Sequence, residues 1–99
     1  MIAYKLLRVK ANGAITPLFI NNTKELPIGE WMDAEDHPTN GYAHRPGWHC
    51  TQHPKAPHLS EKGRSWYHVE IDDYEILNRP RAQGGIWFLA KRMRILDPV

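Results

Sequence analysis

The alternation of apolar and polar residues along the chain predicts a protein built mainly from β-strands. Residues 3–9 place apolar side chains on two faces and are followed by Asn12-Gly13, a dipeptide typical of a two-residue hairpin turn. Residues 14–20 are expected to return as the second strand, with Pro17 favouring an edge position because proline has no amide hydrogen to donate. The first twenty residues are therefore predicted to form a β-hairpin.

Trp66–Ile71 shows the clearest strand pattern, because Tyr67 and every second residue after it are apolar while the residues between them face the other way. Asp72-Asp73 is expected to start a turn, and the Pro-, Arg- and Gly-rich residues up to 85 are expected to form a long irregular connection. Residues 86–96 are rich in aromatic and branched side chains and predict a final strand. The spacing of the apolar residues at 89, 93 and 96 also suits a helix.

The middle of the chain lacks a clear period. Residues 25–36 suit a short strand or a helical turn, since Pro27 and Gly29 interrupt any longer element. Residues 37–41 are a turn by composition, and residues 54–60 are compatible with about one turn of helix. Residues 42–59 hold four of the six histidines, the single cysteine and three prolines, which indicates a stiff, chemically rich loop.

These elements predict one domain over residues 1–99, mainly β, with a small α+β arrangement as the alternative. We expect a compact, curved antiparallel sheet with a long Pro/His-rich loop and at most one or two short helices. The 99 residues suffice for a single modest core. No apolar run approaches the roughly 18–20 residues of a membrane span, no secretory leader is evident, and one cysteine fits a reducing compartment. A cytoplasmic monomer or homo-oligomer without membrane contact is expected.

The charge is distributed unevenly although the net charge of +2 is too small to argue for nucleic-acid binding. Residues 25–36 carry only acidic charges. The charged residues between positions 76 and 96 are all basic: Arg79, Arg81, Lys91, Arg92 and Arg94. Such a distribution gives either one face that attracts an anionic ligand or a solvated surface balanced by the acidic block.

Two kinds of chemistry suggested by residues 42–59 are weighed and set aside. His49, Cys50 and His53 have a spacing reminiscent of zinc ligands, but adjacent side chains on an extended backbone diverge, so no metal and no other cofactor is predicted. Cys50 follows Trp48 and His49 closely, which is more typical of a small buried side chain than of a nucleophile. No catalytic residue is predicted.

Binding of a nucleotide-type ligand fits the side chains of this region better. Indole rings can stack on a base, guanidinium groups can hold phosphate through two parallel hydrogen bonds, and imidazoles can donate to phosphate or ribose oxygens. The alternative is that the tryptophans belong to the core. The residues predicted to bind the ligand are Arg45, Trp48, His49, His58, Arg64 and Trp66, with His68 beside them on the neighbouring strand.

Several motifs occur in an order that resembles a known domain. They are Pro17–Ile20, Pro27–Trp31 with Ala34-Glu35, Arg45–His49 with Pro54, Ala56 and His58, and Trp66–Ile71. Over residues 15–72 they resemble an uncharacterised domain of bacteriophage and mobile-element proteins, including large phage polyvalent proteins, whose mark is the Arg-Pro-Gly-Trp-His motif. The resemblance implies a phage or mobile-element origin and brings no established activity.

A more distant similarity concerns ADP-ribosyltransferase-like domains. It rests on Gly47–Thr51, Pro54, Ala56 and Val69-Glu70. In those domains the corresponding segment lines a nicotinamide dinucleotide pocket, which adds Thr51 to the predicted ligand-binding residues. No earlier motif of the His-Gly-Thr type precedes the segment, so the similarity implies a nucleotide-shaped pocket more than transfer chemistry.

Three functions are compatible with the sequence. The first is a small phage-encoded binding protein for an anionic nucleotide, which sequesters a host defence signal in the host cytoplasm. The second is an ADP-ribosyltransferase-like or nucleotide-cleaving enzyme. The third is an inhibitor that binds a host protein through exposed tryptophans.

Overall fold

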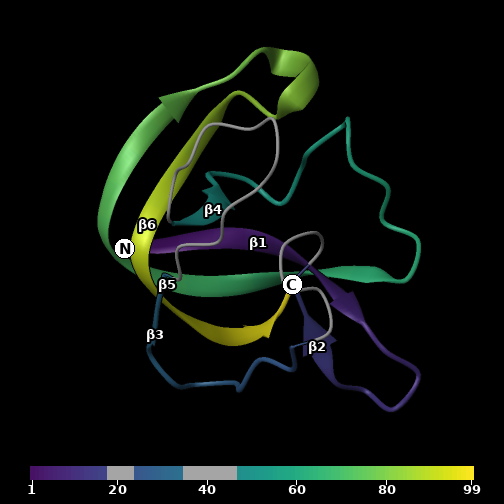
Figure 1. The fold of residues 1–99 in the computed structure, drawn as a ribbon. Helices are drawn as coiled ribbons and strands as arrows, with labels where there is room; N and C mark the ends of the chain where they lie inside the picture. The colour runs from purple at the N-terminus through teal and green to yellow at the C-terminus, as the bar shows by residue number, and fades with distance from the viewer. Residues whose placement is uncertain (18–23, 35–46) are drawn as a thin grey trace, which may run out of the picture.

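The computed structural model describes residues 1–17, 24–34 and 47–99, in which β-strands dominate and the single helical element is one short 3₁₀ turn (Figure 1). The strands are β1 (Ile2–Val9), β2 (Ile15–Thr16), β3 (Met32–Asp33), β4 (Trp48–Thr51), β5 (Arg64–Asn78) and β6 (Ile86–Pro98). The 3₁₀ turn, η1 (Arg81–Gln83), lies between β5 and β6. The prediction of a mainly β, antiparallel fold is confirmed. No helix in the described ranges is long and apolar enough to span a bilayer.

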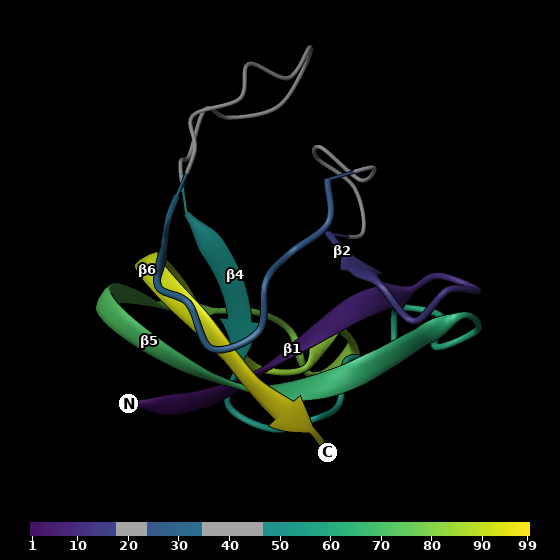
Figure 2. The same cartoon turned by 90° about the horizontal axis from the view of Figure 1, so that it is seen from below.

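Four of the strands pair with one another in a closed ring (Figure 2). β5 pairs with β1 on one side and with β6 on the other, while the short β4 bridges β6 back to β1. β2 extends the ring beside the end of β1, and β3 lies along β6. All these strand pairs are antiparallel, and the closure leaves the ring with an inner and an outer face.

The long hairpin of β5 and β6 differs from the prediction in one respect. The expected turn at Asp72-Asp73 is wrong, because β5 continues through both residues to Asn78. Asp73 takes a positive φ of 53°, which aspartate tolerates better than most residues, and its carboxylate lies 3.8 Å from Lys91 on β6. Cross-strand pairing of the exposed acids thus lets an acidic dipeptide remain within a strand.

The N-terminal hairpin and the last strand form as predicted, whereas the described middle of the chain forms little regular structure. The hairpin at Asn12-Gly13 is confirmed by the pairing of β1 with β2, and the hydrogen bond from Lys10 N to Ala14 O closes a loop of residues 11–13, one residue longer than a two-residue turn. Of the returning strand predicted over residues 14–20, Ile15–Thr16 form β2, Ala14 and Pro17 are not part of it, and residues 18–20 lie outside the described residues. Residues 86–96 form a strand and not a helix. Of residues 25–36, the described part contributes the short β3 and an isolated bridge from Ile28 to Ile95, whereas residues 35–36 and the turn predicted at 37–41 lie outside the described residues. Residues 54–60 contain a hydrogen-bonded turn in place of a helical one.

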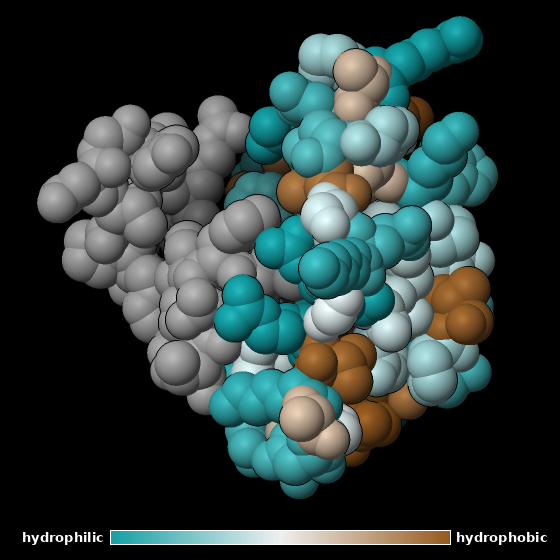
Figure 3. All heavy atoms as spheres, turned by 90° about the vertical axis from the view of Figure 1, so that its right-hand side faces the viewer, coloured by the Kyte–Doolittle hydropathy of each residue, from teal (hydrophilic) through white to brown (hydrophobic). Residues whose placement is uncertain are grey.

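Apolar side chains gather in two clusters on the two faces of the ring. The inner cluster contains Ala3, Leu7, Ile15, Leu26, Cys50, Tyr67, Val69, Ile71, Phe88, Ala90, Met93 and Ile95. The outer cluster contains Leu6, Ala56 and Trp66, with Tyr4, Leu59 and Trp87 packed against it. Ala56 and Leu59 belong to the loop 52–63, so this loop is held over the outer face of the sheet. Figure 3 shows mostly hydrophilic side chains around separate apolar spots on one side of the molecule.

Candidate anion-binding site

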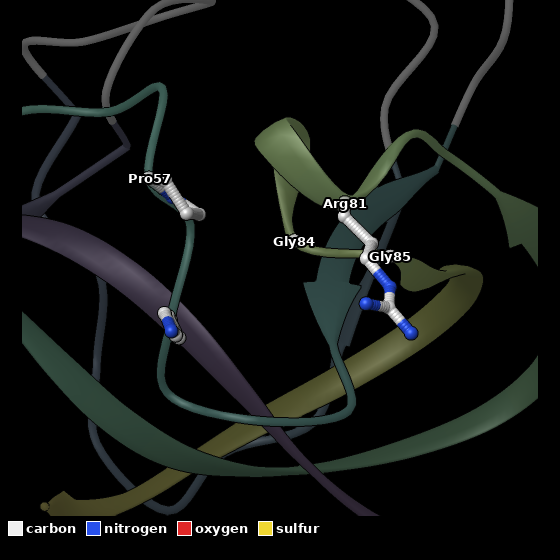
Figure 4. A pocket seen from close by; sticks show the side chains of 5 residues that line it. Pro57, Arg81, Gly84 and Gly85 are labelled. Atoms are coloured by element: carbon white, nitrogen blue, oxygen red, sulfur yellow. The ribbon is translucent and has the colours of Figure 1, made fainter.

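A hollow of about 220 Å³ lies between the loop 52–63 and the connection of β5 to β6. Its lining consists of Lys55, Pro57, Arg81, Gly84 and Gly85. Figure 4 shows Pro57 on one side of the hollow and Arg81 with the two glycines on the other. The lining therefore combines two cationic side chains, a rigid ring and two residues without side chains.

Gly84 brings the two loops into contact. Its φ of +99° is a conformation that favours glycine, and it caps η1 through a hydrogen bond from its N–H to Arg81 O. A Cβ atom at this position would lie 2.9 Å from Lys55 O and 3.2 Å from Trp87 Nε1. The close approach of Lys55 to the glycine pair thus depends on the missing side chain.

The wall of the hollow that carries Lys55 and Pro57 is held in place by contacts of the loop 52–63. Ala56 is buried in the outer cluster, and the Thr51 hydroxyl donates a hydrogen bond to His53 O at 2.5 Å. Lys55 N also donates to His53 O, at 2.7 Å, and Pro57 restricts the backbone that follows. These contacts hold the backbone of Lys55 in place while its ammonium group remains exposed.

The charges around the hollow favour an anion. No acidic residue lines it, and none of the ion pairs formed among the described residues involves Lys55 or Arg81. Arg79 adds a third cation to the same connection, two residues from Arg81. Cations without a counter-charge give a positive potential, and the Arg81 guanidinium has the fork geometry that phosphate accepts.

Trp87 stands beside the hollow, and the imidazole rings of two histidines lie near its indole. Its ring centroid lies 5.9 Å from that of His58 in the loop and 6.5 Å from that of His49 on β4. Its indole N–H donates to Gln83 O at 2.6 Å, which fixes the ring against η1. The half-buried indole therefore offers a rigid aromatic surface next to the cationic lining.

The structure brings together only some of the residues predicted to bind a ligand. His49 and His58 meet at Trp87, as described above. Arg45 lies outside the described residues. Arg64 donates a hydrogen bond to Ser60 O at 2.9 Å, at the far end of the loop.

Trp48 and Trp66 belong to different faces of the sheet. Trp48 packs against the inner cluster and its indole N–H donates to Met32 O at 3.2 Å. Trp66 is 8% exposed in the outer cluster, and its indole N–H donates to Glu61 Oε1 at 2.8 Å. Thr51 is buried as well. The two tryptophans therefore do not share one pocket, and we do not include them in the site.

His68 makes no ring contact with Trp87 among the described residues. Its ring centroid is 5.2 Å from that of Tyr4, and its Nδ1 is 3.4 Å from Asp97 Oδ1. These neighbours belong to β1 and to the end of β6. Like Arg64, His68 stays a predicted ligand residue without support from the hollow.

The interior of the ring holds a cysteine and a lysine near each other. Burial raises the pKa of the Cys50 thiol to about 11, with the charge of Lys5 opposing the shift. Burial likewise lowers the pKa of Lys5, whose ammonium donates to His49 O at 2.6 Å. A thiol with a raised pKa is a poor nucleophile at neutral pH. This agrees with the expectation that Cys50 is a buried structural residue.

The described part of the chain contains no cluster of side chains suited to bind a metal ion. There, no three side chains of His, Cys, Asp or Glu lie close enough together to hold a metal ion. His44 falls outside the described residues.

Sequence reasoning missed the residues that line the hollow. Lys55 and Pro57 belong to a loop whose histidines predicted a site, and Arg81 with Gly84-Gly85 belongs to a connection predicted to be irregular. The available signal was the glycine pair between a basic segment and Trp87, in a region without acids. No family model, curated protein or solved structure matches this chain.

Proposed function

We propose that this protein is a binding module for a small anionic ligand of the nucleotide type, held at the hollow between Lys55 and Arg81. The observation that supports the proposal most is the acid-free lining with two cations beside the rigid indole of Trp87. A phosphate would contact Lys55 and Arg81, and a base would lie on the exposed part of the half-buried Trp87. In line with the phage resemblance, the proposed role is to sequester a host signalling nucleotide in the host cytoplasm.

The size of the hollow bears on what the site holds. Pockets that enclose whole drug-sized ligands usually measure about 300–1,000 Å³. A hollow of about 220 Å³ is smaller and fits a phosphate with part of its sugar. The remainder of the ligand would then lie across the neighbouring surface around Trp87 and His58.

Calorimetric titration with a panel of nucleoside mono-, di- and cyclic phosphates, together with inorganic phosphate, tests the proposal. Arg81→Lys and Lys55→Gln should each weaken the binding of the best nucleotide, since a hydrogen bond to a charged group contributes about 1.5–3 kcal/mol. Lys62→Gln removes an exposed cation away from the lining and should leave binding unchanged. Equal effects of the three substitutions would mean that only the net charge matters.

Incubation of the protein with the same nucleotides separates binding from the enzymatic and protein-binding alternatives. Glu70 accepts a hydrogen bond from Arg94 Nε at 2.6 Å, so the glutamate nearest to a transferase pattern is already paired. Recovery of unchanged nucleotide with a raised melting temperature supports binding, whereas new products by chromatography support an enzyme. If no nucleotide raises the melting temperature and none is converted to a product, the proposal is refuted and a protein partner is favoured.

A further inference from the structure

The second half of β5 has an edge that no described strand covers. β5 pairs with β1 only as far as Glu70, whereas its pairing with β6 continues to Asn78. Residues 72–78 are therefore bonded to β6 on one side, and the described residues place no strand on the other. In Figures 1 and 2 this half of β5 lies at the outside of the fold. Unpaired backbone N–H and C=O groups at such an edge can bond to an added strand.

Apolar side chains on this half of β5 are left partly uncovered. Tyr74 is 39% exposed and Ile76 is 60% exposed. They lie opposite Ala90 and Phe88 of the inner cluster, and the Tyr74 ring meets Phe88 edge-on at 5.4 Å. An added strand would bring its own side chains beside them, which is how cross-strand pairs stabilise a sheet.

The charges along this edge select the kind of strand that can be added. Residues 72–78 contain Asp72, Asp73 and Glu75 and no Lys or Arg. The two aspartates face cations of β6, but Glu75 is exposed and has no ion-pair partner among the described residues. A second copy pairing edge to edge would bring its own three acids next to these three, which is unfavourable. A segment with cations at alternate positions would neutralise them.

We propose that the edge at residues 72–78 accepts an extended peptide segment in which apolar residues alternate with Lys or Arg. The segment adds to β5 as an antiparallel strand in line with β1. β1 already uses the adjoining part of the same edge, where Ile71 N donates to Met1 O at 2.9 Å. Main-chain hydrogen bonds supply affinity in this mode of recognition, and alternate side chains supply specificity. The surface shares no residue with the lining of the hollow.

The test uses a fluorescein-labelled, acetylated and amidated hexapeptide of alternating lysine and valine, with binding followed by anisotropy. We expect the peptide to bind, and its alternately N-methylated form to bind more than about tenfold more weakly because hydrogen bonds to the edge are lost. A glutamate–valine peptide should also bind more weakly.

Matched protein variants locate the contact. Glu75→Lys should weaken binding of the lysine–valine peptide about five- to tenfold, whereas Glu25→Lys, an equal change of charge at an exposed residue outside β5, should leave it within about twofold. Amide chemical shifts should change mainly at residues 72–78. Equal affinity for the N-methylated peptide, or no difference between the two variants, would overturn the proposal. So would dimerisation of the free protein through this edge in sedimentation velocity.

Discussion

Replacing Gly84 by alanine should be among the most destabilising single-methyl additions in this chain, and Gly85 provides the matched control. Both glycines have positive φ values, +99° and +80°, so alanine at either position pays the cost of left-handed backbone, about 1–2 kcal/mol. At Gly85 the added Cβ would meet nothing within 4 Å. At Gly84 it would lie 2.9 Å from the backbone oxygen of Lys55, and a backbone atom cannot rotate away as a flexible side chain can.

The difference between the two variants isolates the contact between the loops. Forcing a methyl group into a packed site costs typically about 1–3 kcal/mol, and a lost hydrogen bond from Trp87 to Gln83 would add about 0.5–1.5 kcal/mol. The reduced entropy of the unfolded chain is common to both substitutions and cancels. Gly84→Ala is therefore expected to lower the free energy of unfolding by about 1–4 kcal/mol more than Gly85→Ala does.

Urea titration followed by tryptophan fluorescence measures both free energies, provided that the m-values agree. The result that would refute the reasoning is a pair of equal unfolding free energies. In that case the backbone of Gly84 does not approach Lys55, and the hollow between them does not exist as described. Loss of nucleotide binding in Gly84→Ala at temperatures where it remains folded would connect this contact to the proposed function.

Three further predictions concern buried residues. Trp66→Ala should lower the free energy of unfolding by about 3–5 kcal/mol, whereas Trp31→Ala, at a residue 38% exposed, should lower it by less than half as much in the same urea titration. Cys50 should react with iodoacetamide at pH 8 much more slowly in the native protein than in denaturant, and equal rates would contradict its burial. Burial raises the pKa of Cys50 from 9.0 to about 11, so the unfolded state releases the thiol proton at a lower pH than the native state does. The contribution of Cys50 to the free energy of unfolding should therefore fall as the pH rises from about 9 to about 11. The stability difference between the wild type and Cys50→Ala should shrink over the same range, and a constant difference in pH-dependent urea titrations would refute the shift.

The fold class follows from the sequence wherever a strand has one buried face. The alternation in Trp66–Ile71 and the branched residues of 86–96 predicted two of the ring strands, because an antiparallel sheet buries every second side chain. The extension of β5 beyond Ile71 was not predictable from local patterns. An Asp-Asp pair normally indicates a turn, and here its partners on β6 lie about twenty residues away in the chain.

The candidate site was predictable only in part, for a related reason. The composition of residues 42–59 drew attention to the loop that carries Lys55 and His58. The hollow also needs Arg81 and Gly84, and nothing in the local sequence indicates that these two loops meet. Whether a tryptophan belongs to the core or borders the site depends on which face of the sheet it lies on. The alternation of Trp48 and His49 shows that they lie on opposite faces, but it does not indicate which face the loop 52–63 covers.

The closed ring has a consequence for how the chain folds. The hairpin of β5 and β6 joins neighbouring parts of the sequence, whereas the pairing of β1 with β5 joins residue 2 to residue 70. The loss of chain entropy on closing so long a loop precedes the gain from its contacts. We therefore expect the hairpin to form early and the docking of β1 to limit the rate, which gives folding times of roughly milliseconds to seconds, as for other proteins dominated by non-local strand pairing.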